Sequence, residues 1–222
     1  MSEFVCRAAR IGLASVRANA IPMVVLWFVS LAMVCCYYLL PGFRDELEPL
    51  VRWQTQGGCG AAFLSRFVFC GVATAPFLRL VRAIRSKWSV IVAQALWAGV
   101  CGVLTDWMFS LNEAWFGAGV DFKTLCLKAA VCQFAWTPFV FMPLGTVVYL
   151  WLGRGLSFSR LKAEWPPRLI GDFFCPNLLL NWAVWIPTTM MLTMFPTALQ
   201  IQLSGFVGVL YALLLLSIGK NK

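Results

Sequence analysis

The feature that most constrains this fold is the uneven placement of Lys and Arg between long apolar stretches. A helix needs about 20 residues to cross a bilayer, and six stretches are that long: Ile21–Leu40, Gly60–Leu78, Trp88–Leu111, Thr124–Leu152, Phe173–Phe195 and Leu199–Ile218. If every stretch crosses, one side of the membrane receives 13 of the 18 cationic side chains and the other side only 3. Inserted helices follow such a positive-inside bias. The chain is therefore predicted to be a polytopic membrane protein with both termini on the positive side.

The composition leads to the same class. Of the 222 residues, 61% are hydrophobic and 12% are charged, which leaves too little polar surface for a compact soluble body. In hydrocarbon every backbone N–H and C=O needs an internal partner, and helices provide one. The predicted fold is all-α, a single bundle of four to six membrane-spanning helices over residues 21–218. An Arg-bearing segment, residues 1–20, precedes it, and a short basic tail, residues 219–222, follows.

Charge, cysteine and histidine content narrow the function. The net charge of +9 is spread over three loops and two termini, so we expect contact with anionic lipid headgroups and no nucleic acid. The nine cysteines include no CxxC pair and are interpreted as small buried apolar side chains, not as a metal site. Histidine, the usual general base near neutral pH, is absent. We expect neither an enzyme nor a cofactor.

The N-terminal segment carries Arg7, Arg10 and Arg17 with a single acid, Glu3. Such an Arg-bearing, acid-poor helix is typical of mitochondrial targeting, and an interfacial anchor leading into the first span fits equally well. The gap Pro41–Cys59 holds prolines, glycines and three acids, and is predicted to be a solvated, turn-rich loop.

Polar residues at membrane depth are the candidate functional residues, because each is expensive there and needs a partner. Two cations, Arg66 and Lys128, lie inside the apolar stretches. The fourth and fifth stretches supply the predicted pore-lining or helix-packing residues: Lys128, Gln133, Asn177, Asn181 and Thr188. Two alternatives stay open for them, a cavity in which Lys128 favours anions, and hydrogen bonds that only hold helices together.

Prolines accompany these polar residues. Each removes a backbone donor and favours a kink whose freed carbonyls can line a cavity. The predicted kink positions are Pro138, Pro143, Pro176 and Pro187. Asp106, near the end of its stretch beside Trp107 and Trp115, is expected at a solvated helix end in the headgroup belt.

Part of the chain, from Asp121 to about Met191, resembles the Mpv/PMP family of peroxisomal and mitochondrial inner-membrane proteins. Lys128, Gln133 and Pro138 keep the order and spacing of that family's Lys, Gln and Pro, with Cys132 in place of an Asp. The segment LKAEWPP resembles its acid-aromatic-Pro motif, and DFFCP followed by Pro187 echoes its two later Pro positions.

The resemblance implies a small integral protein of the mitochondrial inner membrane, or alternatively of the peroxisomal membrane, that forms or regulates a pore for small solutes. A homo-oligomer is compatible with it. The competing hypothesis from the residues is a non-catalytic membrane assembly protein whose polar side chains only join helices.

Overall fold

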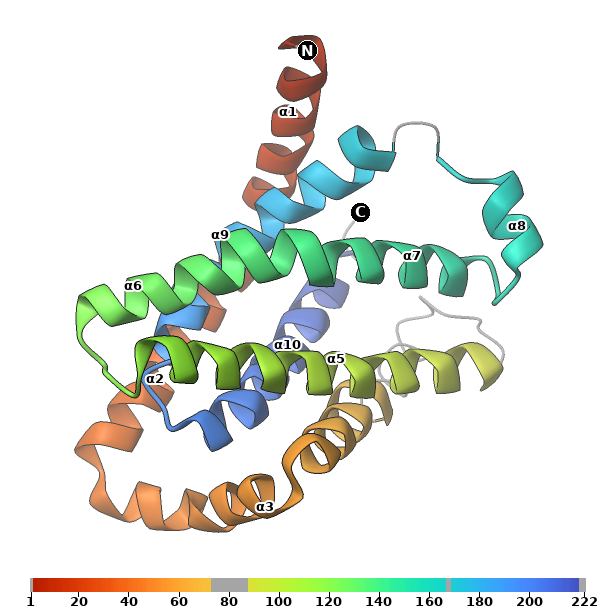
Figure 1. Ribbon diagram of the computed structural model, residues 1–222. Coiled ribbons are helices and arrows are strands. Elements are labelled where there is room, and N and C mark those ends of the chain that lie inside the picture. Colours follow the sequence, from red (N-terminus) through yellow and green to blue (C-terminus); the bar gives the residue numbers. More distant parts are fainter. Residues whose placement is uncertain (1, 73–87, 167–168, 220–222) are drawn as a thin grey trace.

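The computed structural model describes residues 2–72, 88–166 and 169–219, and this part of the chain is helical with no strand (Figure 1). Its α-helices and π-helical segments (η) follow in the order α1 (Ser2–Ala18), α2 (Ala20–Leu39), α3 (Pro41–Arg66), η1 (Phe67–Val72), α5 (Trp88–Phe116), α6 (Phe122–Ala130), η2 (Val131–Phe141), α7 (Met142–Gly153), α8 (Phe158–Ala163), η3 (Leu169–Phe174), α9 (Cys175–Leu192) and α10 (Thr197–Gly219). The predicted all-α bundle is confirmed.

Three of the predicted spans are long and apolar enough to cross a membrane: α2, α5 and the continuous rod α6–η2–α7, Phe122–Gly153. The stretch Gly60–Leu78 runs partly outside the described residues, and the part of α10 whose side chains are described, Thr197–Val209, is a shorter apolar helix. In α9, two asparagines and two prolines lower the hydropathy. Length and composition therefore support three crossings directly.

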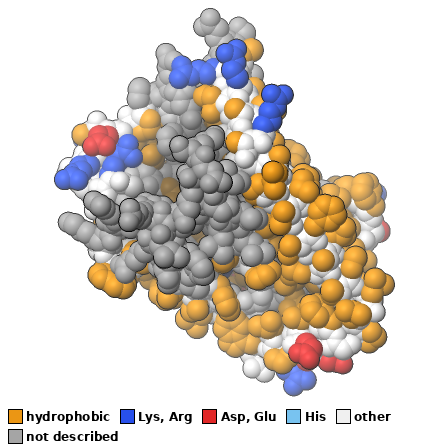
Figure 2. Space-filling model, turned by 180° about the vertical axis from the view of Figure 1, so that it is seen from behind, with side chains coloured by type: hydrophobic (Ala, Val, Ile, Leu, Met, Phe, Trp, Pro, Cys, Tyr) orange, Lys and Arg blue, Asp and Glu red, His pale blue; other side chains and the backbone are white. Residues whose placement is uncertain are grey.

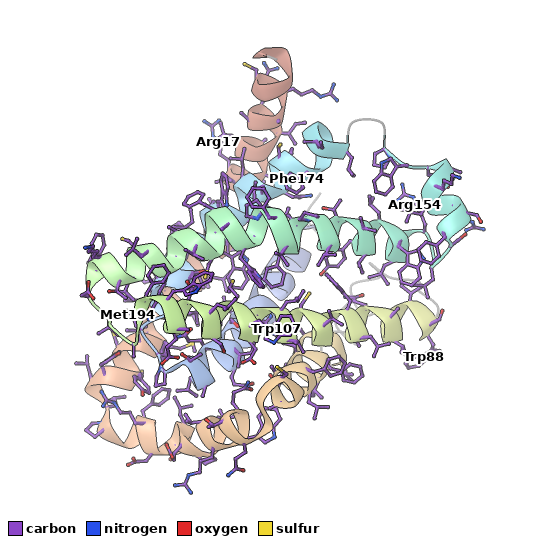
Figure 3. All side chains as sticks on the ribbon, viewed as in Figure 1. Arg17, Trp88, Trp107, Arg154, Phe174 and Met194 are labelled. Carbon is purple, nitrogen blue, oxygen red and sulfur yellow. The ribbon has the colours of Figure 1, made fainter. Side chains whose placement is uncertain are left out.

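The rod α6–η2–α7 runs beside α5 in the opposite direction (Figure 1). As a result, Trp88 at the start of α5 and Arg154 after α7 lie at the same end of this pair (Figure 3). Exposed hydrophobic side chains cover much of the outer surface, and charged ones lie toward its ends (Figure 2). Cys132 is fully buried as predicted, whereas Cys35 is exposed on this apolar surface, contrary to expectation.

The prediction of a turn-rich loop over Pro41–Cys59 is wrong, because this segment forms most of α3. Pro41 occupies the first turn, where its fixed φ suits a helix and its missing N–H costs nothing. Gly58, with φ of 48°, bends the chain between the two halves of α3. The proline and glycine signals thus mark a helix start and a kink.

The second half of α3 packs closely on α5 through glycine. Gly99 faces Phe63, and Gly102 lies against the carbonyl oxygen of Ala62 and the side-chain stem of Arg66. A Cβ atom at either glycine would overlap these neighbours. Small residues at helix contacts allow backbones to approach in a membrane protein, and this approach fixes where Arg66 lies.

We expect Gly102→Ala to lower the free energy of unfolding by about 1–3 kcal/mol, because the added methyl group forces α3 and α5 apart. Gly60→Ala is the matched control in α3, since a Cβ there meets no atom within 4 Å. Thermal unfolding of both variants in detergent checks this. Equal unfolding temperatures for the two would contradict the close packing.

Asp121 caps the N-terminus of α6. Its carboxylate accepts hydrogen bonds from the Thr124 hydroxyl and from the Thr124 backbone N–H, the latter at 3.1 Å, and these bonds lower the pKa of Asp121. Because the folded pKa lies below the unfolded one, the cap contributes fully above the unfolded pKa and is lost as the pH falls through the folded pKa. Carbon-13 NMR titration should show this low midpoint, and Thr124→Ala should raise it; a midpoint unmoved by Thr124→Ala would contradict the assignment.

Candidate functional site

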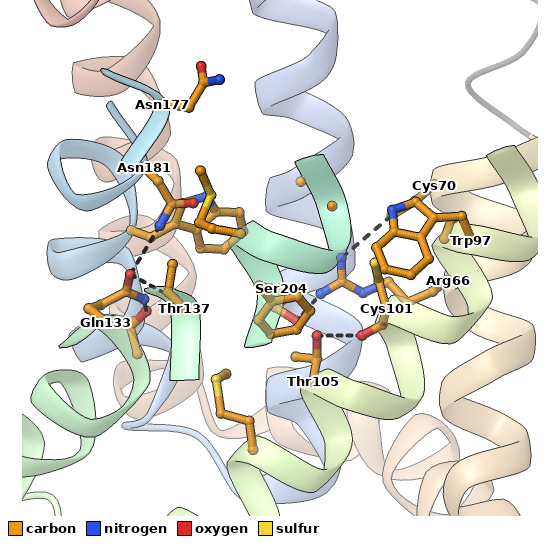
Figure 4. Close-up of a pocket in the computed structure, with 18 of the residues that line it drawn as sticks. Arg66, Cys70, Trp97, Cys101, Thr105, Gln133, Thr137, Asn177, Asn181 and Ser204 are labelled. Carbon is orange, nitrogen blue, oxygen red and sulfur yellow. Dashed lines mark hydrogen bonds between the residues drawn. The ribbon is translucent and has the colours of Figure 1, made fainter. Parts of the chain in front are cut away.

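A cavity of about 700 Å³ lies inside the bundle, between α3, η1, α5, the rod η2–α7, α9 and α10 (Figure 4). Most of its wall is apolar or aromatic. The polar and charged residues that line it come from five of these elements and are Arg66, Gln94, Thr105, Gln133, Thr137, Thr146, Asn177, Asn181, Thr189 and Ser204. Arg66 is the single cation among the lining residues that the structure describes.

Arg66 lies at the end of α3 and extends into the cavity (Figure 4). One terminal nitrogen, Nη2, donates to the Ser204 hydroxyl at 2.7 Å, and Nη1 contacts the Cys70 sulfur at 3.8 Å. The Nε atom is buried and has no hydrogen-bond partner. Within the described part of the chain, no carboxylate forms an ion pair with Arg66.

Two glycines lie close to this guanidinium. A Cβ atom at Gly205 would lie 3.4 Å from the Arg66 Nε atom, and one at Gly208 would lie 3.5 Å from Nη1. Both glycines belong to α10, next to Ser204. Thus α10 supplies a hydroxyl partner to the charge and packs two glycines against it.

Gln133, in η2, is the centre of a second polar group on the opposite side of the cavity (Figure 4). Its side-chain nitrogen donates to the Thr189 hydroxyl at 2.9 Å, and its side-chain oxygen accepts from Asn181 at 3.2 Å. The same oxygen accepts from Thr137, and the Gln133 backbone carbonyl accepts from the Trp182 indole N–H at 2.6 Å. These bonds join η2 to α9.

The structure brings together three of the five predicted polar residues. Gln133, Asn177 and Asn181 line the cavity, with Asn177 exposed and apart from Arg66 (Figure 4). The other two, Lys128 and Thr188, are not among the residues that line the cavity; their exposed fractions are 3% and 0%, as expected for the helix-packing alternative. The residues of α9 that line the cavity include Asn181, Trp185 and Thr189, which follow one another at intervals of four and so share one face of the helix. Thr188 precedes Thr189 by one residue, a rotation of about 100°.

The predicted kinks coincide largely with π-helical segments. Pro138 lies inside η2, where the Met142 N–H bonds to the Thr137 carbonyl one residue further back than in an α-helix. Pro143 and Pro176 occupy the first turns of α7 and α9, directly after η2 and η3. By contrast, Pro187 lies inside α9, which continues past it as α-helix.

Sequence reasoning missed a further polar chain that joins α3, α5 and α10. Ser65 donates to Gln202 at 2.6 Å, Gln202 to Gln54 at 2.8 Å, and Gln54 to the Asp106 carboxylate at 3.1 Å. Asp106 is thus engaged within the bundle and not simply solvated. Gln54 was not a candidate because its segment was predicted to be a loop.

Comparisons of this chain with family models, curated proteins and solved structures found no match. Among the described residues, no group of His, Cys, Asp or Glu side chains is placed to hold a metal ion. The described residues that line the cavity offer one guanidinium, amides, hydroxyls, two thiols and aromatic surfaces.

Gln133→Leu should lower the free energy of unfolding by about 1–2 kcal/mol, since it leaves Asn181 and Thr189 without their partner. Asn177→Leu is the matched control: it also removes an amide from the cavity wall, but no hydrogen bond is recorded for it. Unfolding of purified protein in detergent provides the measurement. Equal losses in both variants would contradict a structural role specific to Gln133.

Proposed function

We propose that this chain is an integral membrane protein that takes up a small anionic solute in its central cavity, as part of forming or regulating a pore. The observation that carries the proposal is Arg66, a cation that lines an intramembrane cavity and has no acidic partner in the described part of the chain.

A charge at membrane depth is costly, and such residues ordinarily pair or serve a solute path. The bonds of Arg66 to Ser204 and Cys70 supply no negative charge. A bound anion would supply it. The volume of about 700 Å³ falls within the range of about 300–1,000 Å³ typical of small-molecule sites.

The resemblance to the Mpv/PMP family and the basic helix α1 support placing this activity in an organelle membrane, with the mitochondrial inner membrane proposed first and the peroxisomal membrane as the alternative. In α1, Arg10 and Arg17 are exposed, so they are available to anionic headgroups. Contact with such lipids is part of the proposal.

A second function, membrane assembly, is favoured by a different observation. The Gln133 side chain is 4% exposed and is hydrogen-bonded through both its nitrogen and its oxygen to α9 or to its own helix. That is the behaviour of a residue that joins helices. The two functions divide between the two sides of the cavity, so they can be tested separately.

In planar bilayers containing the purified protein, we expect a conductance that prefers anions, and Arg66→Glu should reverse or abolish the preference because it changes the sign of the charge in the cavity. Arg160→Glu is the matched control, since it makes the same charge change at an exposed position of α8. No conductance, or an unchanged preference in Arg66→Glu, would contradict the proposal. If Asn181→Leu lowers stability but leaves permeation unaltered, the result would support the assembly role for the side of the cavity that holds Gln133.

A further inference from the structure

We propose that the ligand of the cavity is an organic monocarboxylate with an apolar body, its carboxylate on Arg66 and its body along the aromatic wall. This inference rests on the site of the proposed function and names the chemical class of its solute. It concerns equilibrium binding, and so does not require that the solute is conducted.

The carboxylate of the ligand is inferred from the hydrogen-bond donors of Arg66 that have no partner in the described part of the chain. Ser204 and Cys70 each engage one of the terminal nitrogens, while Nε is buried without a partner. Nη1 and Nη2 each carry a second N–H, and this planar end of the guanidinium matches the two oxygens of a carboxylate. The Ser204 hydroxyl holds the fork in place, and the absence of a side chain at Gly205 and Gly208 lets α10 pack against the guanidinium.

The charge of the ligand follows from the lining. Among the described residues that line the cavity, Arg66 is the single cation and none is an acid. One negative charge on the ligand therefore balances the site. A nucleotide or a dicarboxylate would bring at least one more charge into a wall with no second cation, where an unpaired charge is expensive.

The apolar part of the ligand is inferred from the apolar residues that line the cavity. Between Arg66 and the Gln133 group the lining is formed by large apolar and aromatic side chains, among them Trp97, Phe109, Phe141, Met142, Leu180 and Trp185. An inorganic anion would leave this surface uncovered, whereas an alkyl or aryl body would bury apolar area at about 25 cal/mol per Å². The amides of Gln133 and Asn181 are already engaged with each other, so they do not require a polar tail.

The test measures octanoate binding to the protein in phosphatidylcholine nanodiscs, by displacement of an octanoic acid that carries a diazirine on its chain. Mass spectrometry locates the crosslinks. We expect them on cavity residues, displaced by octanoate but at least about tenfold less well by octanol, which lacks the charge, and by acetate, which lacks the body. Octanedioate should also compete weakly, because its second carboxylate has no cation.

Variants provide the second arm. Arg66→Gln should weaken octanoate binding by about tenfold or more, Arg66→Lys should retain part of it, and Arg160→Gln should leave it unchanged. The ligand series uses unaltered protein, so it stays decisive if Arg66→Gln does not fold. Octanol competing as well as octanoate, octanedioate competing equally, or Arg66→Gln binding normally would each overturn the inference.

A third arm separates a free carboxylate from an anionic membrane lipid, which offers the same headgroup chemistry. Replacing part of the phosphatidylcholine with phosphatidylglycerol should leave octanoate binding unchanged, and displacement by this lipid would overturn the assignment to a free carboxylate. Octanoate binding without any conductance would contradict the proposed pore and leave this inference standing. Conductance of chloride without octanoate binding would overturn this inference and leave the proposed pore standing.

Discussion

The arrangement of this bundle depends on one constraint: a polar group placed among apolar helices must find its partner inside the protein. Gln133 meets it fully, since its side chain and its carbonyl bind Asn181, Thr189 and Trp182 of α9. Arg66 meets it only in part, because Ser204 and Cys70 supply hydrogen-bond partners but no negative charge. This difference separates a residue that joins helices from one whose charge has no acidic partner in the described part of the chain.

The position of Arg66 is fixed by the packing of α3, α5 and α10. Gly102 brings the backbone of α3 close to α5, and the kink at Gly58 redirects α3 toward that contact. The polar chain from Ser65 through Gln202 and Gln54 to Asp106 links the three helices beside it. An arginine held by a single hydroxyl would otherwise be free to extend toward the membrane surface, so this framework keeps the charge in the cavity.

Hydropathy and charge placement were sufficient to predict an all-α membrane protein and to locate α2, α5 and the rod α6–η2–α7, because these depend on composition within one segment. They could not predict the helix over Pro41–Cys59, where prolines and glycines begin and bend a helix that tertiary contacts stabilise. Of the residues predicted on α9, Asn177 and Asn181 line the cavity, whereas Thr188 is buried outside it and its neighbour Thr189 lines it, since small rotations of a helix decide which of two neighbours faces a cavity.

The sequence places two cations inside apolar stretches, Arg66 and Lys128, and Lys128 was the one predicted as a candidate site residue. The depth of a residue along a helix does not give the direction in which its side chain extends. In the structure Lys128 is buried outside the cavity, and Arg66 lines it. A planar guanidinium with a free edge selects for shape as well as for charge, which an ammonium group does not. The change of residue therefore changes the expected chemistry, from a general preference for anions to recognition of a flat, two-oxygen anion.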